Sequence, residues 1–129
     1  MVDDSLVRGT TSHKIVKMLY DAGAKEVHVK IACPEIKFPD FYGIDMPSKK
    51  ELLAANKNLK EMCKHIQADS LKFLSLEGLY RAIFNQGRNN TYPQLTDHYF
   101  TGEYPVDLVD QVKSDKVAQL SLLSGKSSN

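Results

Sequence analysis

Several features that would mark a particular class of protein are scarce in this sequence of 129 residues. There are only two cysteines, Cys33 and Cys63, and their spacing suits neither a metal site nor a disulfide framework. The 17 basic and 16 acidic side chains leave a net charge of +1, which gives no broad field for attracting nucleic acid or an anionic membrane. No apolar run is long enough to span a bilayer, and no basic-then-apolar leader is visible. We therefore expect a cytoplasmic protein in which any bound anion is held by a local site.

Hydrophobic periodicity indicates a helix followed by a strand in the first quarter of the chain. Thr11 or Ser12 is expected to cap the helix and Gly23 to close it. Apolar residues at helical spacing predict an inner face made of Ile15, Met18, Leu19 and Ala22. Alternation of apolar and polar residues then predicts a strand over 26–32, and Pro34 should end it.

The middle of the chain predicts a loop, two helices and a second strand. Residues 34–47 are rich in proline and aromatic residues, which favours a long, ordered loop. Ser48 and Glu51 match a capping box before a helical pattern over 52–66, which is expected to break near Asn56–Asn58. Leu71–Leu74 is a candidate strand.

Beyond that strand, Ser75 is expected to cap a helix. Its inner face should carry Leu76, Leu79, Tyr80 and Ile83. Residues 85–104 predict no regular element, and the tail after Asp107 predicts at most a short helix with a frayed end. The alternation of helices and strands predicts an α/β fold with a mostly parallel sheet.

The segment Val2–Ser12 carries the most chemical information. Asp3 and Asp4 resemble the acidic end of a strand, where α/β sheets bind ligands, although no strand precedes them; the start therefore suggests an N-terminally truncated domain. Carboxylates there can accept hydrogen bonds from ribose hydroxyls or hold Mg²⁺. Gly9 would let the backbone approach an anion, and the hydroxyls and free amides of Thr10, Thr11 and Ser12 would suit a phosphate.

Less specific interpretations of these residues are also open. Two aspartates before a turn are common in solvated loops, Gly-Thr-Thr-Ser can be only a helix cap, and Arg8 can be solvated rather than bound to phosphate. The four histidines have no metal-like spacing, and surface or capping roles are expected for His13, His28, His65 and His98. Cys33 and Cys63 are expected to be small core residues rather than nucleophiles.

Val2–Ser12 also resembles the phosphoribosylpyrophosphate-binding signature of type I phosphoribosyltransferases, in the version found in glutamine phosphoribosylpyrophosphate amidotransferases. The resemblance continues in family order up to about Val106. It is carried by Gly23-Ala-Lys-Glu-Val-His-Val-Lys30, Phe41-Tyr-Gly-Ile-Asp-Met-Pro47, Ala68-Asp-Ser-Leu71, Leu74-Ser-Leu-Glu-Gly-Leu79 and Phe100-Thr-Gly-Glu-Tyr-Pro105. Residues 1–106 therefore resemble part of a Rossmann-like phosphoribosyltransferase domain, and 107–129 form a tail.

The resemblance implies roles for the loop. Asp3 and Asp4 would engage the ribose hydroxyls and the Mg²⁺ that accompanies pyrophosphate. The binding site for phosphoribosylpyrophosphate would comprise Asp3, Asp4, Ser5, Leu6, Val7, Arg8, Gly9, Thr10 and Thr11. The family reaction releases ammonia from glutamine and uses it to displace pyrophosphate from the ribose, giving phosphoribosylamine for purine synthesis.

The chain also departs from the family pattern. Neither cysteine matches the glutaminase nucleophile, and the first strands of the transferase half have no counterpart. Some members carry an iron–sulfur cluster, but the ligand positions correspond to Asp40, Thr96 and Tyr99, so no cluster is expected. A separate chain could supply the missing parts, oligomers are not excluded, and a non-catalytic remnant remains the alternative. A phosphoribosyltransferase that acts on a base is disfavoured by the match downstream of the loop.

Overall fold

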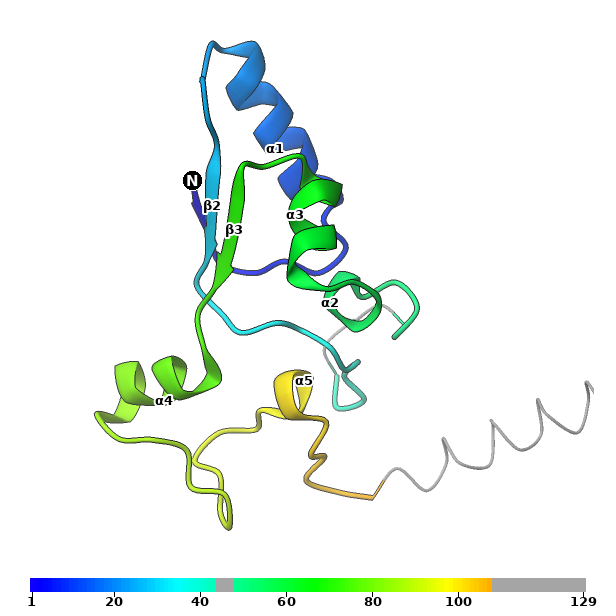
Figure 1. The fold of residues 1–129 in the computed structure, drawn as a ribbon. Coiled ribbons are helices and arrows are strands. Elements are labelled where there is room, and N and C mark those ends of the chain that lie inside the picture. The colour runs from blue at the N-terminus through cyan, green and yellow to red at the C-terminus, as the bar shows by residue number, and fades with distance from the viewer. Residues whose placement is uncertain (44–47, 108–129) are drawn as a thin grey trace, which may run out of the picture.

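The structure, a computed structural model, describes residues 1–43 and 48–107 (Figure 1). Three strands and five helices occur in this part of the chain. In chain order they are β1 (Val2–Asp3), α1 (Thr10–Asp21), β2 (His28–Ile31), α2 (Leu53–Asn56), α3 (Leu59–Ile66), β3 (Ser70–Phe73), α4 (Leu76–Phe84) and α5 (His98–Thr101). None of the described helices is long and apolar enough to cross a membrane.

The strands form one parallel sheet in the order β1-β2-β3, which confirms the predicted α/β class. Val2 is in register with Lys30, and Val29 with Leu71. Strand β1 is short and lies at an edge, held by backbone hydrogen bonds such as that from Ala32 N to Asp3 O (2.9 Å). Asp3 is the second residue of β1 and Asp4 follows it, so the acidic pair lies at the carboxyl end of a two-residue strand that the sequence analysis did not predict.

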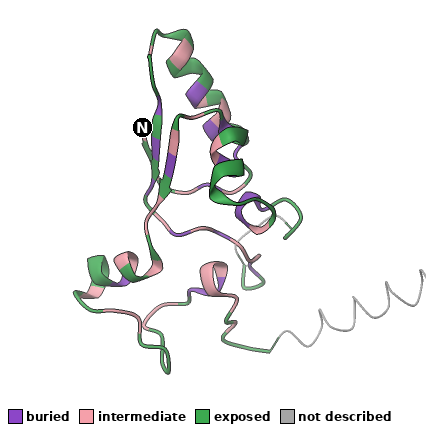
Figure 2. Ribbon diagram, in the orientation of Figure 1, coloured by how far each residue is buried: buried purple, intermediate pink, exposed green. Residues whose placement is uncertain are grey.

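Helices α1 and α3 both pack on one face of the sheet (Figure 1). Val29 and Ile31 of β2 point into this layer and are buried, whereas His28 and Lys30 are exposed, as the alternation predicts (Figure 2). The core between helices and sheet consists of Leu6, Val16, Val27, Val29, Ile31, Leu53, Ala54, Met62, Ile66 and Leu71.

The sheet also has an open apolar hollow of about 450 Å³. Its lining residues come from all three strands and the turns after them: Val2, Lys30, Ile31, Ala32, Lys72, Phe73 and Leu74. Val2 itself is 75% exposed. Parallel sheets in α/β proteins are covered on both faces, so this hollow is the surface that a further layer would fill.

Helix α1 shows where the periodicity argument was wrong. Of the four residues predicted to face the core, Met18 and Leu19 are 67% and 36% exposed, and Ala22 is exposed as well. The buried residues of α1 are instead Ser12 and Val16. The sequence pattern shows that a helix has an apolar face, but it does not show whether that face packs against the sheet of this chain.

The helical pattern over 52–66 divides as predicted, since α2 ends at Asn56 and α3 begins at Leu59. The capping box, however, lies at this break: Asn58 Oδ1 accepts from Glu61 N (3.0 Å), and Glu61 Oε2 accepts from Asn58 N (2.8 Å). Ser48 and Glu51 make only half of the predicted box, with the Ser48 amide donating to Glu51 Oε2 (3.1 Å). The residues between them form a turn.

The C-terminal segment after β3 contains α4 and α5, and α5 corrects the expectation that 85–104 holds no regular element, since four residues are too few for periodicity to indicate a helix. Ser75 caps α4 as predicted, because its Oγ accepts from Gly78 N (3.0 Å). Tyr80 is buried, but Ile83, predicted to face inward, is 52% exposed. The loop predicted over 34–47 is confirmed for 34–43; its last four residues, and the short helix expected in the tail beyond 107, lie outside the described residues.

Candidate functional site

The loop between β1 and α1 encloses a cavity of about 280 Å³. Its lining comprises every residue of the predicted site together with Ser12: Asp3, Asp4, Ser5, Leu6, Val7, Arg8, Gly9, Thr10, Thr11 and Ser12. The cavity opens at the carboxyl end of a parallel strand, where α/β sheets place their ligands. The residues that sequence reasoning grouped together are thus brought around one hollow.

The start of α1 is built to leave backbone donors available. Gly9 is the N-cap residue, with φ of 81°, and no side chain caps the helix. The predicted caps by Thr11 or Ser12 are therefore wrong: both belong to the first turn of the helix, and Ser12 is buried. Because the first amides of a helix have no intrahelical acceptor, they remain available to an anion in the cavity.

The two carboxylates are ordered within the loop itself. Asp3 Oδ1 accepts from the Asp4 amide (3.0 Å), and Asp4 Oδ1 accepts from the Ser5 hydroxyl (3.0 Å). No group of three or more histidine, cysteine or acidic residues that could cage a metal occurs in the described parts of the chain. Two carboxylates fit Mg²⁺, which keeps several waters and takes further oxygens from a substrate's phosphates.

Residues far away in the sequence hold the loop in place. Leu53 N donates to Val7 O (2.8 Å). Arg8 pairs with Glu51, whose Oε1 lies 3.2 Å from both Nε and Nη2 of the arginine. Gly9 lies so close to this layer that a Cβ there would come within 2.9 Å of Leu53 Cδ2.

Sequence reasoning missed Glu51 and Leu53 as supports of the loop. The Ser48–Glu51 pattern drew attention to Glu51, but as a helix cap, and nothing local indicates a contact across 43 residues. Hydrogen bonds from the Ser48 side chain and backbone, and then the one from Arg8, lower the pKa of Glu51. Glu51 is thus an anion at neutral pH, suited to pairing with Arg8.

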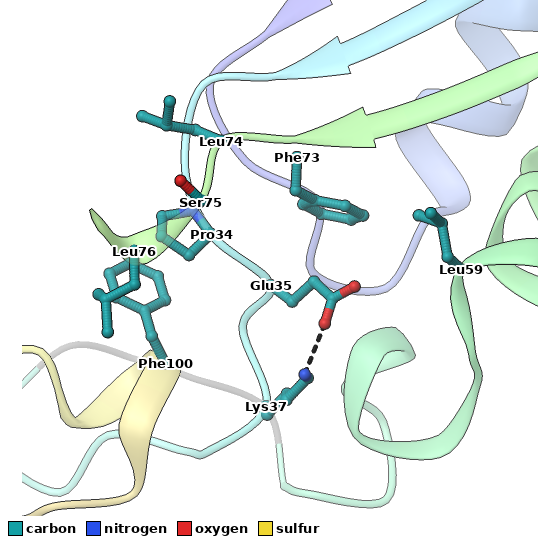
Figure 3. A pocket seen from close by; sticks show the side chains of 9 residues that line it. All are labelled: Pro34, Glu35, Lys37, Leu59, Phe73, Leu74, Ser75, Leu76 and Phe100. Carbon is teal, nitrogen blue, oxygen red and sulfur yellow. Dashed lines mark ion pairs between the residues drawn. The ribbon is translucent and has the colours of Figure 1, made fainter. Parts of the chain in front are cut away.

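A second cavity, of about 350 Å³, lies beyond the carboxyl ends of β2 and β3 (Figure 3). Lys37 and Glu35 form an ion pair on its wall (2.5 Å). The whole lining is Pro34, Glu35, Lys37, Leu59, Phe73, Leu74, Ser75, Leu76 and Phe100. The sequence analysis did not single out this cavity, although its position after two parallel strands was a usable signal.

The remaining candidate residues have structural surroundings. His98 is fully buried, which corrects the expected surface or capping role; its Nε2 lies 2.8 Å from Asp40 Oδ1. Asp40 is buried and Thr96 exposed, while Tyr99 has its pKa raised by burial and by Asp40. The expectation that these three positions bind no iron–sulfur cluster stays a prediction.

Both cysteine thiols are partly buried rather than presented for chemistry. Burial, followed by the nearby Asp4, raises the pKa of Cys33; burial and Asp69 raise that of Cys63. A thiol whose pKa is raised is a poor nucleophile at neutral pH. Both cysteines pack against the aliphatic core, as expected, and the expectation that neither is a nucleophile stays a prediction.

The parallel sheet, with a strand that runs into Asp3-Asp4 and a loop that turns through Gly-Thr-Thr into a helix, belongs to the type I phosphoribosyltransferase fold class. A glutamine phosphoribosylpyrophosphate amidotransferase from B. subtilis, solved with ADP and GMP, matches the fold with a TM-score of 0.75 and 48% identity, over 84% of this chain and 24% of that one. A structure described as the allosteric regulatory enzyme of purine biosynthesis matches with a TM-score of 0.73 and 49% identity, over 84% of this chain and 23% of the other.

Curated relatives agree with the structural matches. The chain is 54% identical to the amidophosphoribosyltransferase of Rhizobium etli over 125 residues, which are 96% of this chain and 25% of the relative. It is 49% identical to that of Staphylococcus epidermidis over 116 residues, 90% of this chain and 23% of the relative. No family profile matches. The chain belongs to the amidophosphoribosyltransferase family and corresponds to a fragment of that enzyme, about a quarter of the length of these relatives.

The match to the Rhizobium relative includes 125 residues of this chain, so it continues beyond Val106. The similarity therefore extends into the tail, further than the sequence motifs indicated.

Proposed function

We propose that this chain carries the ribose-5-phosphate half of the phosphoribosylpyrophosphate site of an amidophosphoribosyltransferase. The observation that carries the proposal is the cavity lined by residues 3–12, a stretch that includes two aspartates and the uncapped N-terminus of α1. The 5-phosphate would accept hydrogen bonds from the first amides of α1 and from Thr10 and Thr11. Asp3 and Asp4 would accept from the ribose hydroxyls and hold Mg²⁺ with its waters.

In the complete reaction, ammonia from glutamine displaces pyrophosphate from the ribose to give phosphoribosylamine. Positive charge develops on the sugar carbon, so catalysis depends on positioning and on electrostatic support of the leaving group. When bound, Mg²⁺ would supply the charge that supports the pyrophosphate. The residues of this chain would anchor the other end of the substrate and fix its orientation.

The chain spans about a quarter of the length of its relatives, so the full reaction also needs the parts of those relatives that lie outside the match. The apolar hollow on the sheet and the exposed face of α1 with Met18 and Leu19 are surfaces suited to packing against those parts. We expect the chain alone to be inactive in phosphoribosylamine formation, and we expect it to act in the cytoplasm.

The test is calorimetric titration of the purified chain with phosphoribosylpyrophosphate and Mg²⁺. The variant Asp3→Asn/Asp4→Asn removes both carboxylate charges, and Asp21→Asn, at an exposed carboxylate paired with Lys17, is the matched control. We expect saturable, Mg²⁺-dependent binding that the double variant loses and the control keeps. A folded chain that binds no phosphoribosylpyrophosphate would refute the proposal.

The second candidate is a non-catalytic remnant that binds ribose phosphate weakly or serves only a structural role. It is favoured by the open hollow on the sheet, which leaves β1 at an edge with few supports. Adding the missing parts of a relative as a separate polypeptide separates the two candidates. Restored phosphoribosylamine formation favours the enzyme fragment, whereas an inert mixture that still binds the sugar phosphate favours the remnant.

A further inference from the structure

One short segment contacts three consecutive residues of the phosphate loop, Val7, Arg8 and Gly9. Residues 48–53, here called the loop clamp, approach the loop from the outside: the described residues that line the cavity are 3–12 alone. Within the clamp, Glu51 N donates to Ser48 O (2.8 Å), and the Ser48 hydroxyl donates to Glu51 Oε2 (3.1 Å). The clamp is therefore a closed turn with its own internal hydrogen bonds.

The central contact fixes one peptide unit of the loop. Leu53 occupies the first position of α2, and its amide is one of those that a helix cannot satisfy internally. It donates to Val7 O (2.8 Å). The peptide between Val7 and Arg8 is trans and planar, so its N–H points opposite to its carbonyl. Holding the Val7 carbonyl toward Leu53 turns the Arg8 amide away from the clamp.

The neighbouring contacts act on the same stretch. Glu51 holds the Arg8 guanidinium through an ion pair in which Oε1 lies 3.2 Å from Nη2. Leu53 and His65 close the space above Gly9, where a Cβ would come within 2.9 and 3.0 Å of their side chains. Gly9 also has a φ of 81°, which other residues adopt only with strain. Val7, Arg8 and Gly9 are thus each held by a contact with the clamp.

We propose that the loop clamp is a positioning element for phosphate binding: the Leu53 amide and Glu51 orient the peptide of Val7 and Arg8 so that the Arg8 N–H joins the amides of the α1 N-terminus in the cavity. The inference rests on the proposed function, since it concerns the same phosphate. Leu53 and Glu51 touch no substrate and act only through the loop.

Leu53 offers an unusually clean test. Leu52 is extended (φ −70°, ψ 117°) and Leu53 is the first helical residue, a position that suits proline. Leu53→Pro removes the amide donor, whereas Leu53→Ala keeps it, and both lose most of the leucine side chain. The probe is ribose 5-phosphate, followed by calorimetry and by the NMR shift of the Arg8 amide. Urea unfolding measures whether the two variants are equally stable and fully folded under the binding conditions.

We expect Leu53→Pro to bind ribose 5-phosphate roughly 3- to 10-fold more weakly than Leu53→Ala, the range of one hydrogen bond. The Arg8 amide should shift on binding in Leu53→Ala and not in Leu53→Pro. Equal affinities and equal shifts would overturn the clamp while leaving the proposed function intact. Absence of binding in the unchanged chain would instead overturn both.

A second pair of variants tests the clamp without proline. Glu51→Gln keeps the acceptor for Ser48 but loses the charge that holds Arg8, and Glu77→Gln removes the same charge from the exposed Arg81–Glu77 pair on α4 (3.1 Å). Both are solvent-exposed pairs of small energy, so we expect a loss of roughly 2- to 5-fold in ribose 5-phosphate affinity for Glu51→Gln and none for Glu77→Gln. Equal affinities in these two variants would contradict the role of Glu51.

Discussion

Two regions of this molecule differ in the kind of side chain that they bury. In the sheet layer, residues 1–33 and 48–74, the core is a cluster of aliphatic side chains between α1, α3 and the strands. In the C-terminal segment, residues 75–107, the fully or almost fully buried side chains are Tyr80, Asp97 and His98. Asp97 accepts hydrogen bonds from Tyr80 (2.8 Å) and from Arg88 Nε (2.6 Å), and Arg88 also pairs with Glu103.

The difference has a physical consequence. The stability that comes from apolar burial does not depend on precise direction, and truncating one buried side chain removes only a part of it. A buried charged network depends on each partner, because removing one leaves another desolvated and unpaired. The phosphate loop belongs to the first kind of region. The C-terminal segment, which carries Phe100 to the second cavity, belongs to the second kind.

The largest effect is expected from breaking the network. Arg88→Leu would leave the Asp97 carboxylate buried without its cation, at a cost of about 3–5 kcal/mol. Because the loss is confined to one region, hydrogen exchange should rise in α5 more than in β2. Arg81→Leu, at an exposed ion pair, should change stability by less than about 0.5 kcal/mol. Equal protection of α5 in both variants would refute the role of the network.

The next effect comes from the aliphatic core. Ile66 is fully buried, so Ile66→Ala should lower the free energy of unfolding by about 2–5 kcal/mol in urea titrations followed by circular dichroism. Ile83→Ala, at a position 52% exposed, is the matched control and should cost little. If the two losses were similar, the division into a packed core and an open surface would be incorrect.

A smaller and more local effect is expected at the loop. Gly9→Ala must adopt a left-handed conformation, which costs about 1–2 kcal/mol, and its methyl group would also press on Leu53. Binding of ribose 5-phosphate should fall more than the stability of the sheet layer. Gly23→Ala is the control, since Gly23 also has a positive φ (98°) but nothing lies within 4 Å of the added carbon. Wild-type affinity in Gly9→Ala would contradict this account.

The smallest expected effect is a pH dependence confined to the C-terminal segment. Burial alone would raise the pKa of Asp97, but hydrogen bonds from Arg88 and Tyr80 outweigh it and lower that pKa below its usual range. A carboxyl with a lowered pKa stabilises the fold above its unfolded pKa, about 4, and this contribution is lost as the pH falls through the folded value. Hydrogen exchange in α5 should therefore increase on acidification below about pH 4.

The control for that titration is Asp97→Asn, which cannot ionise. This variant should lower the protection of α5 from hydrogen exchange at neutral pH, and it should lose the further increase in exchange below about pH 4. An α5 whose acid response is the same in Asp97→Asn would show that another group is responsible.

The sequence predicted the local elements better than their surroundings. The strands around His28–Ile31 and Ser70–Phe73, the break before α3 and the Ser75 cap all follow from alternation and capping chemistry within a few residues. The orientation of α1 does not, because its apolar stripe faces away from the sheet of this chain. Sequence periodicity shows that one face of the helix is apolar, whereas tertiary packing determines whether that face is buried.

The candidate site shows the same division. Asp3, Asp4 and Gly9 were identified because a strand end, a tight turn and a helix start are contiguous in sequence. The supports of the loop were not, since Glu51 and Leu53 approach it from more than 40 residues away. The buried Asp40–His98 pair likewise joins positions 58 residues apart.

The long sequence separation between the phosphate loop and its clamp also sets an order of assembly. The loop is synthesised before its clamp, and the contacts that hold Val7, Arg8 and Gly9 form only after Glu51, Leu53 and His65 have been added. Such non-local contacts form late, because the intervening chain must first be ordered. A nascent chain would therefore expose residues 3–12 well before their final geometry forms, and under the proposed function it would acquire affinity for ribose phosphate only once α3 had emerged and docked.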